Sequence, residues 1–225
     1  MRNRSAAGVT IADMKQIRSD QPIIEAQLSA GYESNSRFRD IFSRIIGAAP
    51  TSSGYNNILH ASWLDTCLGP MIAIANQQAL YLLQFVNRRG LAREIGRLSK
   101  KLNAAIIPGR TPIIDLVEDE LNAYFSGKLQ QFKTPLAFVG SPFQQLVWQE
   151  LQKIPYGKTC SYAQLAQAIG KPSAFRAVAQ ANGANQLSII IPCHRVINTS
   201  GELGGYSGGL DRKICLLNRE KKGER

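Results

Sequence analysis

The sequence lacks the patterns that would place the protein in a membrane or outside the cell. None of its apolar runs reaches 18 residues, the length that a membrane-spanning helix needs, so no membrane partner is expected. The first residues, MRNRSAAGVTIADMKQ, are basic but lack the apolar core of a secretory signal. We therefore expect a cytoplasmic protein.

Metal ligands are also scarce. The chain contains two histidines and four cysteines, and no two cysteines form a CxxC pair. Structural zinc sites group four Cys or His ligands closely, and small secreted scaffolds pair their cysteines. The sequence thus predicts no metal site, no cofactor and no disulfide framework, and we expect reduced thiols. The cysteines are Cys67, Cys160, Cys193 and Cys215.

Acidic residues are outnumbered, since 16 Asp and Glu stand against 27 Lys and Arg and give a formal net charge of +11. An excess of this size favours attraction to a polyanion such as nucleic acid, although a solubilising surface would have the same composition. At 225 residues, the chain is long enough for about two domains. Its composition is that of a globular protein.

The most informative stretch is IPCHRV, residues 191–196, which ends the β-branched run of residues 188–191. Such a run before Pro192 predicts a buried strand that stops at the proline and places Cys193 at its end. A thiol next to a basic side chain, here His194, can be poised as a nucleophile. The residues alone leave open the commoner role of a buried structural cysteine.

The segment IPCHRV resembles the active-site signature of O6-alkylguanine-DNA alkyltransferases, together with Asn185 and the stretch GGYSGGLDRK over 204–213. The resemblance covers residues 141–220, and it is closest to the alkyltransferase part of bacterial adaptive-response proteins of the Ada type. It implies DNA repair by direct reversal. The alkyl group of O6-alkylguanine in double-stranded DNA would move once to Cys193, and we expect a monomer.

The resemblance also implies roles for the catalytic residues. Cys193 would be the nucleophile, and His194 would remove its proton through a bridging water. Glu220, in LLNRE, would orient the histidine and stabilise its charged form. Tyr162 would press on the phosphate beside the target nucleotide and donate to N3 of the leaving guanine. From the residues alone, a charged side chain in a basic C-terminal tail is the favoured interpretation of Glu220, and its spacing from the loop 205–209, which fits the family, supports the catalytic role.

Two helices joined by a turn are predicted over residues 162–169 and 174–184, which is a helix-turn-helix layout. The alkyl carbon lies inside the duplex, so the nucleotide must be flipped out before a protein thiol can reach it. The resemblance implies that the second helix enters the minor groove and that Arg176 fills the vacancy. Small residues would let the DNA approach closely, namely Ala177, Ala181 and Gly183.

The substrate pocket is expected around the glycine-rich loop 204–209, because glycine lets a flat base approach the backbone. The resemblance implies that Tyr206, Ser207, Gly208 and Pro192 line this pocket. It further implies that Asn185 ties the turn before the cysteine and positions Cys193.

The predicted fold class is mixed α/β, of the α+β kind, in three parts. Residues 1–55 would form a partial AraC-type helix-turn-helix with a linker, and 56–139 a sheet domain. Residues 140–225 would form a mostly helical, winged-helix-like domain that binds DNA and carries the active site. The pattern over 58–85 predicts a three-stranded antiparallel meander, followed by helices over 88–102 and 113–125. The resemblance implies a ribonuclease-H-like topology for this sheet.

Residues 22–47 predict two short helices with a turn between them, and residues 30–50 resemble the second helix-turn-helix unit of AraC-type regulators. The first unit and a cysteine-rich zinc module are not recognisable. Promoter DNA is thus a candidate second partner, and a helix pair that packs on the rest explains the pattern equally well. Two alternatives to repair remain, a protein that recognises lesions without repairing them and a transcription regulator.

Overall fold

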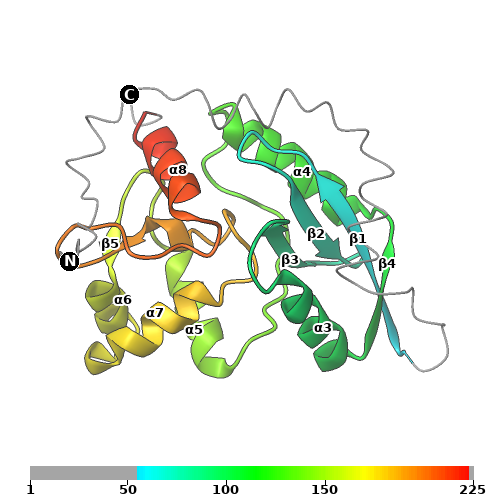
Figure 1. Cartoon of the computed structure of the whole chain (residues 1–225), viewed down its shortest axis with the longest axis horizontal. Coiled ribbons are helices and arrows are strands. Elements are labelled where there is room, and N and C mark those ends of the chain that lie inside the picture. The colour runs from blue at the N-terminus through cyan, green and yellow to red at the C-terminus, as the bar shows by residue number, and fades with distance from the viewer. Residues whose placement is uncertain (1–54, 223–225) are drawn as a thin grey trace, which may run out of the picture.

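A computed structural model gives the arrangement of residues 55–222 (Figure 1). The helix-turn-helix expected over residues 22–47 lies outside these residues. Within the described part of the chain, no helix is both long and apolar enough to cross a bilayer.

The N-terminal part is built on a four-stranded sheet in the order β3-β2-β1-β4. The predicted meander is confirmed, because β2 pairs antiparallel with both of its neighbours. The fourth strand was not predicted, and it pairs parallel with β1 after a helical crossover. The strands are β1 (Asn57–Leu64), β2 (Met71–Ala75), β3 (Leu80–Phe85) and β4 (Ala104–Pro108).

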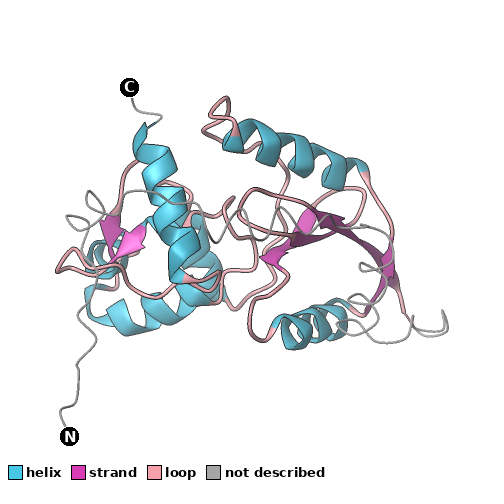
Figure 2. Cartoon of the chain, turned by 45° about the horizontal axis from the view of Figure 1, so that its top comes forward, coloured by secondary structure: helices cyan, strands magenta, loops and turns pink. Residues whose placement is uncertain are grey.

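Two helices cover the two faces of this sheet (Figure 2). Helix α3 (Leu91–Leu102) turns its apolar stripe of Leu91, Ile95 and Leu98 onto one face. Helix α4 (Pro112–Phe125) begins at the N-cap Thr111 and packs on the other face. The sheet is therefore buried on both sides, which explains why all five residues of β2 are buried.

The C-terminal part is mostly helical, as predicted. Helix α5 (Pro142–Leu151) begins with a capping box formed by Ser141 and Gln144. The next two helices are α6 (Tyr162–Ala168) and α7 (Phe175–Gly183), joined through a 3₁₀ turn. A short parallel pair of strands and the last helix complete this part; they are β5 (Cys160–Ser161), β6 (Val196–Ile197) and α8 (Leu210–Lys222).

One apolar cluster joins the two parts of the chain. It contains Phe85 from the sheet, Trp148 from α5, Leu216 from α8 and Cys193. Trp148 also donates a hydrogen bond of 2.8 Å from Nε1 to the carbonyl oxygen of Ala181 in α7. The cysteine motif therefore lies in the packed interior where the two parts meet.

The strand predicted for residues 188–191 is wrong. These residues are buried as expected, but they form a turn with isolated bridges, and Ile189 has a φ of 75°. The backbone of this segment pairs with β3 only where Ser188 N donates to Leu83 O at 2.9 Å. An apolar β-branched run indicates that a segment is buried, but it does not fix its secondary structure. Here the tertiary packing imposes a turn, although the local preference of these residues is for a strand.

Candidate active site

Cys193 begins a single 3₁₀ turn, Cys193–Arg195, directly after Pro192. Its side chain is 1% exposed, and its sulfur accepts a hydrogen bond of 3.1 Å from Asn185 Nδ2. The same amide group donates to Ile191 O at 3.0 Å, while Asn185 Oδ1 accepts from Leu187 N at 2.9 Å. Asn185 thus fixes the turn that leads to Cys193 and contacts the thiol itself.

The resting form of Cys193 is the neutral thiol. Burial raises the pKa of the Cys193 thiol, and the Asn185 hydrogen bond and the positive charge of Lys213 offset only part of that rise. A buried thiol of this kind needs a base to become a nucleophile.

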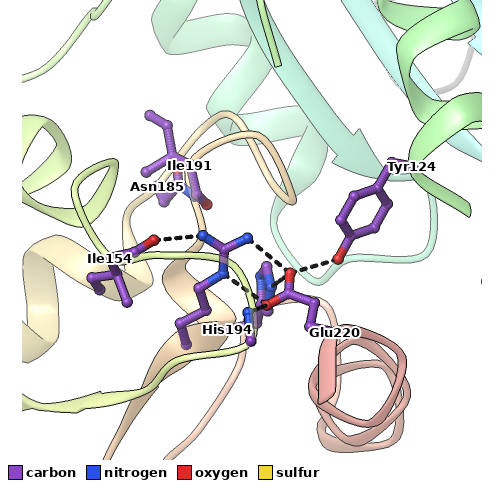
Figure 3. A network of polar contacts seen from close by, with 8 residues as sticks. Tyr124, Ile154, Asn185, Ile191, His194 and Glu220 are labelled. Atoms are coloured by element: carbon purple, nitrogen blue, oxygen red, sulfur yellow. Dashed lines mark hydrogen bonds and ion pairs between the residues drawn. The ribbon is translucent and has the colours of Figure 1, made fainter. Parts of the chain in front are cut away.

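His194 lies beside Cys193 in sequence and is completely buried. Its Nε2 lies 2.9 Å from Glu220 Oε1, an acceptor when ionised, so Nε2 carries the hydrogen (Figure 3). Burial lowers the pKa of the imidazole, which keeps the ring neutral near pH 7. The lone pair is therefore on Nδ1, which has no hydrogen-bond partner among the described residues. Within the described part of the chain, the geometry leaves the lone pair of Nδ1 without a hydrogen-bond partner, on the residue that follows Cys193.

Glu220, on α8, is the centre of the polar network in Figure 3. Arg195 donates from Nε to Oε2 at 2.8 Å and from Nη2 to Oε1 at 2.9 Å. The Tyr124 hydroxyl donates to Oε1 at 2.7 Å, and Gly157 N donates to Oε2 at 3.3 Å. Burial alone would raise the pKa of Glu220, but the hydrogen bonds from His194 and Arg195 and the positive charge of Arg195 outweigh it and hold the pKa well below 4.5. The carboxylate stays ionised.

A buried cation stands on the other side of the motif. Lys213 is fully buried on α8, and its Nζ donates to Val196 O at 2.6 Å and to Gly204 O at 2.9 Å. Burial lowers the pKa of Lys213 to about 8, and a negative charge on Cys193 would raise it. The ammonium therefore joins the glycine-rich loop to β6 and favours the thiolate electrostatically.

The tyrosines expected at the site lie around the same thiol. Tyr162 begins α6. Burial raises the pKa of its hydroxyl, and a negative charge on Cys193 contributes a smaller rise. The same two causes raise the pKa of Tyr206 well above 10. A β-carbon placed on Gly204 would come within 2.9 Å of the Tyr162 hydroxyl oxygen, so this loop position has room only for glycine. The Tyr206 ring lies edge-on to the His194 ring, with the centroids 6.4 Å apart.

The residues expected to line one pocket are divided between two. A cavity of about 430 Å³ is lined by Tyr206, Ser207 and Gly208, and Ser207 Oγ is buried without a hydrogen-bond partner among the described residues. Pro192 lines a separate cavity of about 570 Å³ with Arg195. Gly208 is required sterically, because a β-carbon there would lie 2.6 Å from the Tyr206 ring.

On α7, Arg176, Ala177 and Gly183 are exposed, as a surface that contacts DNA requires. Ala181 is only 2% exposed and packs in the core, away from the exposed residues of α7, so its expected contact with DNA stays a prediction. Its small side chain serves the packing of α7 on α5, where its carbonyl oxygen accepts the Trp148 hydrogen bond. Helical periodicity from Val178 to Ala181 would have indicated this inward face.

Sequence reasoning missed two members of the polar network, Tyr124 and Arg195, and the buried cation Lys213 outside that network. Arg195 stands inside the IPCHRV motif, and Lys213 ends the stretch GGYSGGLDRK, so both had a signal in the sequence. Tyr124 had none, because it lies 96 residues from the carboxylate that it contacts. Among residues 55–222 no cluster of three or more His, Cys, Asp or Glu side chains is arranged to hold a metal ion.

The arrangement defines a class of site: a buried cysteine followed by a buried histidine whose ring is held by an ionised glutamate, on a mixed α/β fold. The comparisons with known proteins agree with this class. Residues 142–222 match the family model described as "6-O-methylguanine DNA methyltransferase, DNA binding domain".

Relatives extend the match beyond this segment. The methylated-DNA–protein-cysteine methyltransferase of Mycobacterium leprae is 42% identical over 164 residues, which cover 73% of this chain and 93% of the relative. The crystal structure of the Mycobacterium tuberculosis O6-methylguanine methyltransferase is 41% identical, covers 73% of this chain and 93% of its own, and has a TM-score of 0.63.

A Mycobacterium tuberculosis OGT crystallised in complex with DNA is 38% identical, covers 74% of this chain and 94% of its own, and has a TM-score of 0.62. The chain therefore belongs to the family of methylated-DNA–protein-cysteine methyltransferases.

Proposed function

We propose that this protein repairs DNA by direct reversal, moving the alkyl group of O6-alkylguanine in double-stranded DNA to Cys193. The observation that carries the proposal is the buried thiol beside His194, whose imidazole is held by Glu220 at 2.9 Å. Family membership supports the substrate, because the relatives are named for methylated DNA and one was crystallised with DNA.

The first step is a proton transfer. His194 Nδ1 accepts the proton of the Cys193 thiol through a bridging water. The positive charge that develops on the imidazole is stabilised by the carboxylate of Glu220, which is already ionised. Lys213 and the Asn185 amide then stabilise the thiolate. This sequence of events explains why a thiol whose pKa is raised by burial reacts near neutral pH.

The second step is an in-line displacement at the alkyl carbon. The sulfur–carbon bond forms while the carbon–O6 bond breaks, and the bonding electron pair leaves with the guanine. Tyr162 donates a hydrogen bond to N3 of the leaving base, and Ser207 is placed to donate near O6. The product is a thioether, which water does not cleave, so each molecule acts once.

The target base reaches Cys193 only after it leaves the duplex. We place the DNA on the exposed face of α7, where Arg176 fills the vacated stack and Ala177 and Gly183 allow close approach. In this proposal residues 140–225 bind DNA and carry out the transfer, residues 56–139 form the scaffold domain, and the protein acts as a monomer in the cytoplasm.

The N-terminal residues enter the proposal only through their sequence. The likeness to Ada-type proteins and the AraC-type pattern within residues 22–47 would make promoter DNA a further partner, and deleting residues 1–50 would then abolish sequence-specific binding. Equal affinity of the full chain for random duplexes would remove this part of the proposal.

The test is to incubate the purified protein with a duplex that contains one O6-methylguanine and to map the peptide spanning Cys193 by mass spectrometry. We expect one added methyl group on Cys193, saturating at one equivalent per protein. Cys160→Ala is the matched control, because burial and the charge of Glu150 raise the pKa of Cys160 to about 11, and this variant should react normally. Transfer that persists in Cys193→Ala would overturn the proposal.

A further inference from the structure

A basic cleft lies beside the proposed DNA-binding face. Its volume is about 680 Å³, and its walls are α3, the start of α5 and the end of α7. Four basic residues line it at four-residue intervals; we call Arg89, Arg93, Arg97 and Lys101 the basic stripe. Residues four apart lie one above the other on a helix, so Arg93, Arg97 and Lys101 follow α3 along its length, and Arg89 lies in the turn just before its N-cap Gly90.

Most of the positive charge of the stripe is not neutralised within the described part of the chain, and Glu94 compensates Arg97 only in part. Glu94 is the carboxylate in the cleft, and it forms an ion pair with Arg88, which also donates to Gly183 O at 3.3 Å. The charges of Glu94 and Arg88 compensate each other, and the contacts of Arg88 with Glu94 and Gly183 connect α3 to the end of α7.

The stripe residues themselves are available to a ligand. Arg89, Arg93 and Arg97 are exposed and make no hydrogen bond or ion pair to another residue within 55–222. Lys101 Nζ donates to Gly140 O at 3.1 Å, a neutral partner that leaves its charge uncompensated. Three guanidinium groups with free donors match phosphate oxygens, to which arginine can bind in bidentate fashion.

The position of the cleft indicates the ligand. Gln180, Gly183 and Ala184 at the end of α7 form its wall, so it is continuous with the surface that we propose for DNA. Figure 1 shows α6, α7, α5 and α3 along the same lower edge of the molecule. From Arg93 to Lys101 the helical part of the stripe extends over about 12 Å at 1.5 Å per residue. That length spans about three to four phosphates of one strand at 3.4 Å each.

We infer that the basic stripe binds the phosphodiester backbone of the same duplex, beyond the flipped nucleotide. The inference rests on the proposed function and adds to it a contact from the N-terminal sheet domain. The stripe holds the duplex by charge, independently of sequence and of the lesion, so it accelerates the search for damage and plays no part in the transfer at Cys193.

The experiment compares two triple variants of the full chain on an undamaged duplex of about 20 base pairs at several salt concentrations. The stripe variant is Arg89→Gln, Arg93→Gln and Arg97→Gln. The control variant is Lys128→Gln, Lys221→Gln and Lys222→Gln, three exposed lysines at the ends of α4 and α8, which lie at the opposite edge in Figure 1. Both remove three positive charges, so they have equal net charge.

We expect the slope of log K against log salt to become shallower by about 2 to 3 in the stripe variant and by less than about 1 in the control, because each lost phosphate contact contributes about 0.9. The dissociation constant at 0.1 M salt should rise about tenfold or more in the stripe variant. Replacing the same three arginines with lysine should restore most of the slope, since the charges remain.

Methyl transfer to Cys193, measured with protein in excess over a lesion duplex at low salt, should proceed at the wild-type rate in both triple variants. Equal slopes for the two variants, in a protein that binds DNA and methylates Cys193, would overturn the inference and leave the proposed function intact. A wild-type protein that neither binds the duplex nor becomes methylated would overturn both.

Discussion

The sheet and the segment that carries Cys193 are equally buried but are held together in different ways. In β1, β2 and β3 the backbone groups pair with one another in regular ladders. Residues 185–195 are buried as well, yet they make few such pairs. Since buried N–H and C=O groups must find partners, side chains take over that role in the second region.

Those side chains come from distant parts of the chain. Gln84, fully buried in β3, donates to Asn185 O at 2.6 Å and accepts from Ser188 Oγ at 2.9 Å. Lys213, on α8, donates from Nζ to Val196 O, and Arg195 donates from Nη1 to Ile154 O at 2.6 Å. The polar groups that satisfy the irregular backbone are therefore the ones that place Cys193 and His194. Stability and chemistry therefore share their contacts in this segment, whereas the backbone ladders and apolar side chains of the sheet contribute stability alone.

The largest effect is expected from Glu220→Gln. The amide leaves the buried Arg195 charge without its ion partner, which costs about 3 to 5 kcal/mol of unfolding free energy. It also removes the carboxylate that supports His194 as a base, so the transfer rate constant should fall by about 100-fold or more. Urea unfolding and single-turnover methyl transfer would measure the two effects.

Glu120→Gln is the matched control for that variant. Glu120 is also buried, but its partners are neutral: Lys133 N at 2.6 Å, Thr134 N at 3.1 Å and Thr134 Oγ1 at 2.6 Å. We expect a loss of about 1 to 3 kcal/mol and an unchanged transfer rate. If the two glutamine variants slowed transfer equally, the distinction between the two carboxylates would be lost.

The pH dependence of stability tests the same carboxylate without changing the fold. The folded pKa of Glu220 lies well below 4.5, so the unfolded chain binds the extra proton first. The stability from Glu220 is therefore fully present above about pH 4.5 and declines as the pH falls toward the folded pKa. Urea midpoints between pH 3 and pH 7 should fall more steeply in the wild type than in Glu220→Gln, and parallel curves would contradict this assignment.

A change confined to the sheet should affect stability only. Ile74 is fully buried in the cluster between the sheet and α3, the cluster that does not include Cys193. Ile74→Ala leaves a cavity and should cost about 2 to 5 kcal/mol. The transfer rate constant of the folded fraction should remain that of the wild type, and a slower rate would show that the two regions are coupled through the sheet.

A smaller change, at the contact between the sheet and the segment that carries Cys193, should lower both the stability and the rate of methyl transfer. Gln84→Met keeps the size of the side chain but leaves Asn185 O and Ser188 Oγ without this partner, at a cost of about 1 to 3 kcal/mol. Because those groups fix the turn before Cys193, the transfer rate should fall several-fold. A rate equal to that of Ile74→Ala would contradict the positioning role of Gln84.

Much of the fold is readable in the sequence because it depends on local patterns. Alternating and apolar runs predicted the three strands of the meander, and the helices predicted over 88–102 and 113–125 are present as α3 and α4. The signature around Cys193 indicated the family, and the mixed α/β class is confirmed. The parallel strand β4 was missed because its partner β1 is far away in sequence, and no local pattern records that pairing.

The features of the site likewise fall into those that the sequence shows and those that only the tertiary structure shows. The sequence by itself singled out Cys193 and His194, which stand within one short motif, and Asn185, eight residues before the cysteine. Only the tertiary structure decided that residues 188–191 form a turn, that Ala181 faces the core, and that Tyr124 shares the Glu220 carboxylate with His194. The physical reason is that burial and long-range hydrogen bonds are properties of the packed chain, and they override local preferences wherever a buried polar group needs a partner.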